Sequence, residues 1–356
     1  MTIIRDVSPL HSRIFLGLIL AVMARSAIAQ PSNRVTLKSD SSEAEAVLAI
    51  LDKRALHGSV IDADWQRVFA STAYPRLQQA EASMGQPFTD EEFTRFVATL
   101  DGSREQLRQI LRQWQSLDLQ AAVQRSLEYL PPEANIRADV YFVIQPEINS
   151  FVFEPDTPTA AIFLKVDLKS KTREQQGNTL AHEAHHLGLA TVQGAYKREI
   201  SSLPEYARKA AWWMGNFREG MAVLAAAGSP DVHPHADLSE GYRLAWDLEA
   251  ERFDANLNEL NQFFLDTIHG NLLNQADMHE ARTFFGFSGP WYTVGYRMAV
   301  TIEREFGRTA LVATYVDPRR FVARYNEAAM SENAKDGSHL PVFSAEILKA
   351  VDGQNR

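Results

Sequence analysis

The sequence contains no cysteine, and this absence excludes every kind of site that depends on a thiolate. Disulfide frameworks, thiolate zinc sites, iron–sulfur clusters and cysteine nucleophiles are all ruled out. Basic residues are in the minority, since 36 Lys and Arg against 45 Asp and Glu give a net charge of −9, and no basic stripe occurs. A nucleic-acid partner is therefore not expected. Any metal must be held by His, Asp or Glu.

Long apolar runs are also scarce, and the clearest one lies at residues 14–24. It follows Arg5 and Arg13 and precedes a small-x-small pattern that ends at Ala29, which is the three-part layout of a secretory signal. The run is too short to cross a bilayer, because about 20 apolar residues are needed. We expect cleavage after Ala29, no membrane attachment of the mature chain and a secreted or periplasmic location. An uncleaved N-terminal anchor is the alternative.

The remaining sequence changes character twice. Residues 42–130 carry apolar residues at three- and four-residue spacing, which predicts helices. Residues 138–144 and 160–168 are rich in β-branched and aromatic residues, which predicts strands, and the pattern is helical again over 173–350. We predict an α+β, mostly helical fold with a small β-sheet. The expected parts are a signal peptide (1–29), a helical N-terminal lobe (30–135) and a main region (136–356).

The sharpest motif is an H-E-x-x-H sequence at residues 182–186, within a predicted helix. At about 100° per residue, the apolar residues of this helix share one face, and His182 and His186 lie together on another. Two imidazoles one turn apart can bind one metal ion, and the adjacent Glu183 carboxylate can act as general base and acid on its water. The motif predicts catalytic zinc. A histidine-rich surface helix or an incidental structural metal site is the alternative, and His185 is expected at the surface or behind a ligand.

A catalytic zinc site needs a third protein ligand. The metzincin continuation would require Gly and His where the chain has Leu189 and Val192, so that class is excluded. The favoured candidate is Glu219, within the F-R-E-G-M-A segment of a later predicted helix, where Gly220 would let a neighbouring helix approach closely. The other candidates are Glu249, Glu251, His233 and His235.

The H-E-x-x-H motif followed by an E-G-x-A segment resembles the gluzincin metallopeptidases. This resemblance implies a zincin-like core and implies that Glu219 completes a His₂Glu zinc site. A Y-x-x-G segment at residues 292–295 is similar to the segment in which gluzincin aminopeptidases keep a tyrosine, which implies that Tyr292 donates a hydrogen bond to the oxyanion. Tyr296, one turn further on, is the alternative. Over residues 140–330 the arrangement resembles a bacterial family of exported proteins described as zinc-dependent peptidases.

Two further expectations follow from this resemblance. In zincins the strand before the motif helix lines the cleft, so a peptide could add to residues 160–168 by main-chain hydrogen bonds. The spacing between His186 and Glu219 exceeds that of the aminopeptidases, which indicates an inserted loop around residues 196–206. We therefore predict a zinc-dependent peptidase acting on a peptide or protein. The alternatives are an exported, non-catalytic, zinc-stabilised binding module and a zinc hydrolase of a non-peptide amide or ester.

Overall fold

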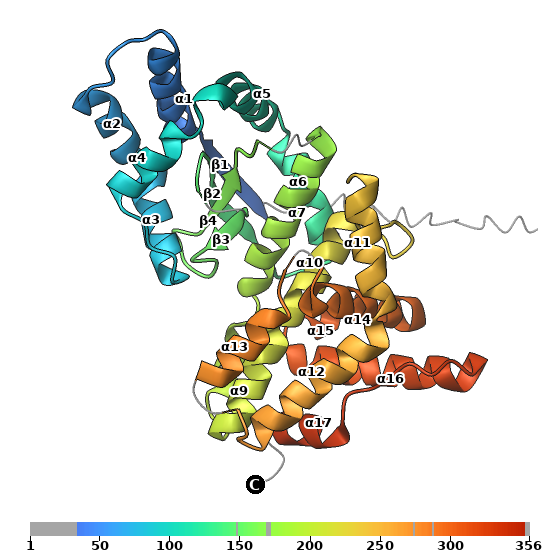
Figure 1. Cartoon of the computed structure of the whole chain (residues 1–356). Coiled ribbons are helices and arrows are strands. Elements are labelled where there is room, and N and C mark those ends of the chain that lie inside the picture. The colour runs from blue at the N-terminus through green and yellow to red at the C-terminus, as the bar shows by residue number, and fades with distance from the viewer. Residues whose placement is uncertain (1–33, 147–148, 169–171, 273–274, 287, 353–356) are drawn as a thin grey trace, which may run out of the picture. The chain divides into compact units, whose positions relative to one another are not determined.

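Four strands form one mixed sheet in the part of the chain that the structure describes (Figure 1). The computed structural model describes residues 34–352 except 147–148, 169–171, 273–274 and 287, so the expected signal peptide and its cleavage site lie outside it. The order is β1-β2-β4-β3, in which β3 alone of these strands is antiparallel to its neighbour. The strands are β1 (Val35–Asp40), β2 (Ile136–Val143), β3 (Phe151–Phe153) and β4 (Ala161–Lys165).

Helices fill the chain between β1 and β2, as the apolar spacing over residues 42–130 predicted. They are α1 (Ser42–Ala55), α2 (Asp62–Phe69), α3 (Ala73–Ser83), α4 (Asp90–Ala98), the 3₁₀ turn η1 (Asp101–Ser103), α5 (Arg104–Gln115) and α6 (Leu119–Glu128). Strand β1 was not predicted, and it pairs with β2 in parallel. The expected N-terminal lobe and the main region therefore share one sheet.

Helices also follow the sheet, which confirms the α+β, mostly helical fold. They are α7 (Arg173–Ala190), α8 (Gly194–Ile200), α9 (Glu205–Met214), the 3₁₀ turn η2 (Gly215–Phe217), α10 (Arg218–Ala227), α11 (Glu240–Glu251), α12 (Phe253–Ile268), α13 (Gln275–Thr283), α14 (Pro290–Phe306), α15 (Arg308–Thr314), α16 (Pro318–Asp336) and α17 (Ala345–Val351). The predicted loop around residues 196–206 is wrong, because most of that segment belongs to α8 and α9. None of the described helices has the length and apolar content needed to cross a membrane.

Both faces of the sheet are covered at β4, so a substrate cannot bind on either face of this strand. On β4, Ile162 and Leu164 belong to the main core, whereas Ala161 and Phe163 join a smaller core with α3. β4 is also paired with β2 over Ala161–Lys165 on one side and with β3 over residues 161–163 on the other. β3 occupies the edge of β4 at residues 161–163, so the expected addition of a peptide to this strand is wrong for that part of residues 160–168. The open edge of this sheet near β4 belongs to β3.

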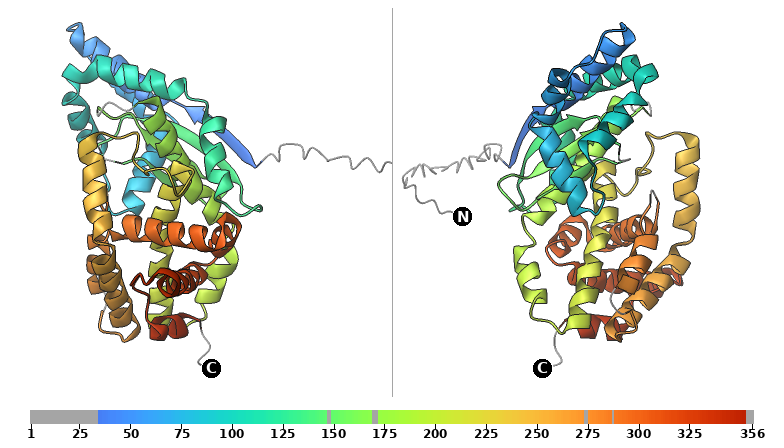
Figure 2. Two further views of the ribbon diagram at one scale, coloured as in Figure 1. Left: turned by 90° about the vertical axis from the view of Figure 1, so that its right-hand side faces the viewer. Right: turned by 60° about the vertical axis from the view of Figure 1, so that its left-hand side comes forward.

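Three helices connect the sheet with the C-terminal helices. α7 packs on the sheet and on α10, and α10 packs on α14. Figure 2 shows α9, α12, α16 and α17 gathered on the side of α10 away from the sheet. An aromatic cluster fills this part of the core around Phe217, with Phe264, Trp291 and Phe343 in edge or tilted contact with its ring. α7, α10 and α14 thus hold a fixed relation to one another.

One buried carboxyl group sits at the end of β2. Glu43, in the first turn of α1, is fully buried, and its Oε2 accepts a hydrogen bond of 2.9 Å from the backbone N–H of Ile144. Its Oε1 has no hydrogen-bond partner among the described residues. Burial raises the pKa of Glu43 to about 8, against the opposing effect of that hydrogen bond. The carboxyl group is therefore protonated in the folded chain at neutral pH.

This pKa predicts a stability effect of Glu43→Gln. The folded-state pKa is above the unfolded value, so stability from the protonated group is full below about pH 4.3 and is lost as pH rises towards 8. Gln stays neutral and should raise the free energy of unfolding by about 3 kcal/mol at pH 7, and by little at pH 4. Urea unfolding at both pH values measures this. The exposed Glu259→Gln on α12 is the control, and equal effects of the two substitutions at pH 7 would contradict it.

Candidate metal centre

Helix α7 presents two imidazoles on the side opposite its core contacts. It begins with a capping box, in which Thr172 Oγ1 accepts from the Gln175 N–H and Gln175 Oε1 accepts from the Thr172 N–H. The predicted apolar face is confirmed, since its residues are fully buried: Leu180, Ala184 and Leu187. His182 and His186, one turn apart, are only half-buried. The helix period thus separates the core-packing face from the half-buried face that carries the imidazoles.

Helix α10 brings Glu219 to these imidazoles, and a pair of glycines sets its position. A Cβ on Gly220 would lie 2.0 Å from Tyr296 N and 2.2 Å from Gly295 C, both backbone atoms of α14. Gly295 in turn faces the backbone of α10, with Gly220 Cα 3.3 Å from where its own Cβ would be. The two helices therefore pack glycine against glycine, as the small residues after Glu219 suggested. This contact fixes the position of α10, and with it the position of Glu219, relative to α14.

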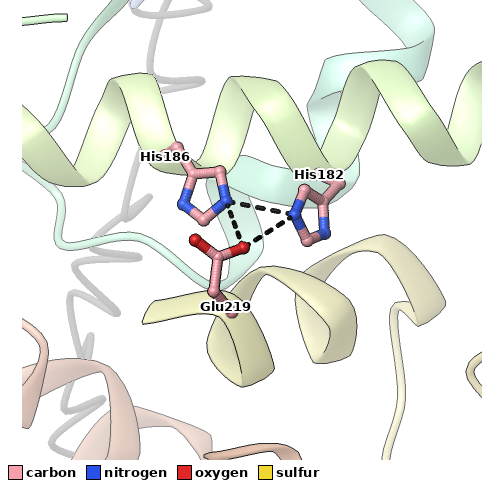
Figure 3. A group of neighbouring side chains, drawn as sticks. All are labelled: His182, His186 and Glu219. Carbon is pink, nitrogen blue, oxygen red and sulfur yellow. Dashed lines mark hydrogen bonds and ion pairs between the residues drawn. The ribbon is translucent and has the colours of Figure 1, made fainter. Parts of the chain in front are cut away.

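The three side chains converge on one point (Figure 3). His186 Nε2 lies 3.0 Å from His182 Nε2 and 3.1 Å from Glu219 Oε2, and His182 Nε2 lies 3.4 Å from the same oxygen. Atoms at the corners of a tetrahedron around zinc, with bonds of about 2.0–2.1 Å, are about 3.3–3.4 Å apart. The donor set of two imidazole nitrogens and one carboxylate oxygen also suits zinc better than calcium or magnesium, which prefer oxygen. The group could hold one metal ion and leave a fourth corner open.

Electrostatics favour the ligand form of the carboxylate. Burial alone would raise the pKa of Glu219, but His186 and His182 outweigh it and hold the pKa well below its usual value. Burial lowers the pKa of His186, which favours the neutral imidazole. Burial also acts on His182, yet the carboxylates of Glu219 and Glu183 together outweigh it and raise the pKa of His182. An ionised carboxylate and neutral imidazoles can bind a divalent cation. Any proton that an imidazole still carries is released when the cation binds.

Glu183 and Tyr292 lie beside this group. Glu183, on α7, has only 8% of its surface exposed, and its charge contributes to the raised pKa of His182. Tyr292, in the first turns of α14, has its ring 6.5 Å from the His182 ring and nearly parallel to it. Burial, with the charges of Glu219 and Glu183, raises the pKa of Tyr292. Its hydroxyl therefore stays protonated at neutral pH and can act as a donor.

Tyr296, the alternative to Tyr292, is turned to another partner. Its hydroxyl donates to the backbone oxygen of Val232 at 3.4 Å, and its ring meets Trp246 edge-on. Burial raises the pKa of Tyr296 to about 12. Tyr292 thus lies near the imidazoles, whereas the hydroxyl of Tyr296 is hydrogen-bonded to Val232 in the segment after α10.

The other candidate ligands do not join the group. Glu249 accepts from Asn256 Nδ2 at 2.8 Å, Glu251 is exposed, and His233 Nε2 lies 2.9 Å from Asp247 Oδ1. His235 packs edge-on against Trp246, and burial lowers the pKa of His235 to about 4, with the nearby charges of His233 and His182 acting in the same direction. Among the described residues, the group that could hold a metal ion is His182, His186 and Glu219.

His185 differs from the surface position that was one of its two expected placements. It is fully buried, its Nε2 lies 3.2 Å from the backbone oxygen of Tyr129, and its ring meets Tyr315 edge-on. Burial lowers the pKa of His185 to about 3, so the ring is neutral. It fixes α7 to the end of α6 behind the ligands. The motif spacing alone cannot show this, because the tertiary partners are distant in sequence.

Arg218 was missed by the sequence analysis. It directly precedes Glu219, is about half exposed, and its Nε lies 3.6 Å from Glu219 Oε1. Its positive charge also acts on His186 and Tyr292, where it opposes protonation of the former and favours ionisation of the latter. The sequence shows a basic residue next to the candidate ligand Glu219. It does not show that the Arg218 side chain points towards the Glu219 carboxylate.

A helix pair that directs two His and one Glu at a point offers the same donor set as the His₂Glu sites of zinc hydrolases. The sequence model of one family, described as "Putative zinc dependent peptidase (DUF5700)", matches residues 52–334, and the chain belongs to this family. The match extends into the N-terminal helices, beyond residues 140–330, over which the sequence resemblance was drawn. Neither a curated protein nor a solved structure matches the chain. The family is described as zinc dependent, and the His182, His186 and Glu219 group could hold that zinc.

Proposed function

We propose that the chain is a gluzincin-type zinc peptidase with a zincin-like core, in which His182, His186 and Glu219 hold the metal. The observation that supports this most is the approach of three side-chain atoms on two helices to within 3.0–3.4 Å of one another, although His186 and Glu219 are 33 residues apart in the chain. Zinc in such a site acidifies water and polarises a carbonyl group. The family description supports a peptide or protein as substrate.

The roles of the other residues follow from their positions. Glu183 takes the proton of the attacking water and delivers it to the leaving amine, because its carboxylate lies beside His182 on the same helix. Tyr292 donates its hydroxyl hydrogen to the oxyanion that develops on the substrate, since its raised pKa keeps the phenol neutral. The α10–α14 glycine contact holds the tyrosine and Glu219 at a fixed separation.

Removal and return of the metal test this function. Zinc-loaded protein should cleave members of a peptide library, a chelator should abolish cleavage, and added zinc should restore it. Intact peptides after incubation with a fully zinc-loaded chain would contradict the peptidase. Unfolding on chelation without any cleavage would then support the non-catalytic binding module. Cleavage confined to non-peptide amides or esters would support a zinc hydrolase of such substrates.

Replacement of the two tyrosines should separate their roles. Tyr292→Phe removes one oxyanion donor and should lower kcat about 10²-fold, with little change in KM. Tyr296→Phe removes the hydrogen bond to Val232 and should change kcat by less than about threefold. Steady-state kinetics on one cleaved peptide measures both. A larger loss in Tyr296→Phe than in Tyr292→Phe would reverse the assignment.

We also propose export of the chain, on the strength of the N-terminal sequence alone. Mature protein in the secreted or periplasmic fraction should begin at Gln30. Recovery of the full-length chain from the cytoplasmic fraction would contradict export.

A further inference from the structure

A positive charge stands next to the metal ligands without a role in holding them. In Figure 3 the dashed lines join one oxygen of Glu219 to both imidazoles. Arg218 Nε lies 3.6 Å from the other oxygen, beyond hydrogen-bond distance. Within the part of the chain that the structure describes, this is the one carboxylate paired with Arg218. The Arg218 side chain is 53% exposed, so it reaches solvent beside the ligand group.

This arrangement does not favour metal binding. A guanidinium near a divalent cation repels it, and the Glu219 charge that Arg218 faces would be shared with the metal. Arginine stays protonated at all ordinary pH values, so the repulsion is permanent. A bound metal would therefore leave Arg218 as a second, exposed cation beside the reaction centre. An anion on the substrate would pair with this exposed guanidinium.

The distance between Arg218 and Glu219 limits where on a substrate such an anion can lie. Arg218 Nε lies 3.6 Å from Oε1 of Glu219, and Oε2 lies 3.1–3.4 Å from the two imidazole nitrogens, so a single carboxylate separates the guanidinium from the point where the ligands converge. One residue of an extended peptide spans about 3.3–3.6 Å. The guanidinium thus reaches a group one or two residues from the scissile bond. Its planar fork matches a carboxylate and can bind it through two hydrogen bonds.

We propose that Arg218 recognises a substrate carboxylate one or two residues from the scissile bond, which makes carboxylate-bearing peptides the preferred substrates. This inference rests on the proposed function. The carboxylate comes either from the C-terminus of a short peptide or from an Asp or Glu side chain. A positioning role for Arg218, in which it orients Glu219 for the metal, is the competing account.

Binding of zinc-directed ligands tests the inference without turnover. Three peptide hydroxamates of equal length are titrated calorimetrically into the zinc-loaded full-length protein: one with a free C-terminal carboxylate, one with a C-terminal amide, and one amide with Glu at its second position. The wild type should bind at least one carboxylate ligand about tenfold more tightly than the neutral amide. The ligand that gains affinity identifies the source of the carboxylate.

Arg218→Gln should bind all three ligands equally, Arg218→Lys should keep part of the preference, and Arg112→Gln, at an exposed arginine of α5, should behave as the wild type. Zinc affinity of Arg218→Gln should be unchanged or higher, because a repulsive charge is gone. Equal binding by the wild type, a preference kept in Arg218→Gln, or weakened zinc binding in that variant would overturn the inference. Failure of every hydroxamate to bind the zinc-loaded wild type would instead overturn the proposed function, and this inference with it.

Discussion

Glu183→Gln is expected to keep one zinc ion per chain and to lower the rate of peptide hydrolysis by a factor of about 10²–10⁴. The amide has the shape of the carboxylate but cannot accept a proton from water at neutral pH. Glu183 lies on α7 next to His182, yet it is not among the three converging ligands, so its loss should leave metal binding intact. Metal content by mass spectrometry and kcat on one cleaved peptide measure the two effects separately.

The control for this substitution is on the same helix. Glu174 is exposed in the first turn of α7, and Glu174→Gln should leave both zinc content and hydrolysis unchanged. Since Glu183 is buried, thermal unfolding of zinc-loaded Glu183→Gln establishes that the variant is folded. Wild-type activity in a folded, zinc-loaded Glu183→Gln variant would remove the proposed mechanism.

Gly220→Ala should be among the most destabilising single substitutions in the chain. The added methyl group would lie 2.0 to 2.6 Å from backbone atoms of Gly295 and Tyr296, and backbone cannot move aside as a side chain can. α10 and α14 would have to separate, which should lower the free energy of unfolding by about 3 kcal/mol or more. The separation would also displace Glu219, so zinc affinity should fall with stability.

A glycine in open space provides the matched control. Gly241 lies within α11, and nothing is within 4 Å of its added Cβ, so Gly241→Ala should raise the free energy of unfolding by about 0.5–1 kcal/mol. Urea unfolding of both variants, with and without zinc, gives the comparison. A Gly220→Ala variant within 1 kcal/mol of the wild type would show that the two helices can part at little cost.

The site was largely predictable because its signals are local. His182, Glu183 and His186 share one helix, and their relative directions follow from the helix period alone. The E-G-x-A segment pointed to Glu219 and to a close helix contact, which the structure shows at Gly220 and Gly295. That these side chains hold zinc and perform hydrolysis stays a prediction.

The parts that could not be predicted depend on distant partners. β1 and β3 are short strands that pair with β2 and β4, and neither was predicted: β1 alternates only over residues 35–38, and β3 is three residues long. β4 was predicted as a strand, but its place between two others depends on the sheet order. The burial of His185 likewise requires Tyr129 and Tyr315, which lie far from it in sequence.

A zinc-edge anomalous difference map from crystals of the zinc-loaded protein tests the account most directly. It should show one ion bonded at about 2.0–2.2 Å to Nε2 of His182, Nε2 of His186 and one oxygen of Glu219, with a fourth position open to solvent. An ion held by other residues, such as His233 and His235, or a Glu219 carboxylate turned away from the metal, would contradict it.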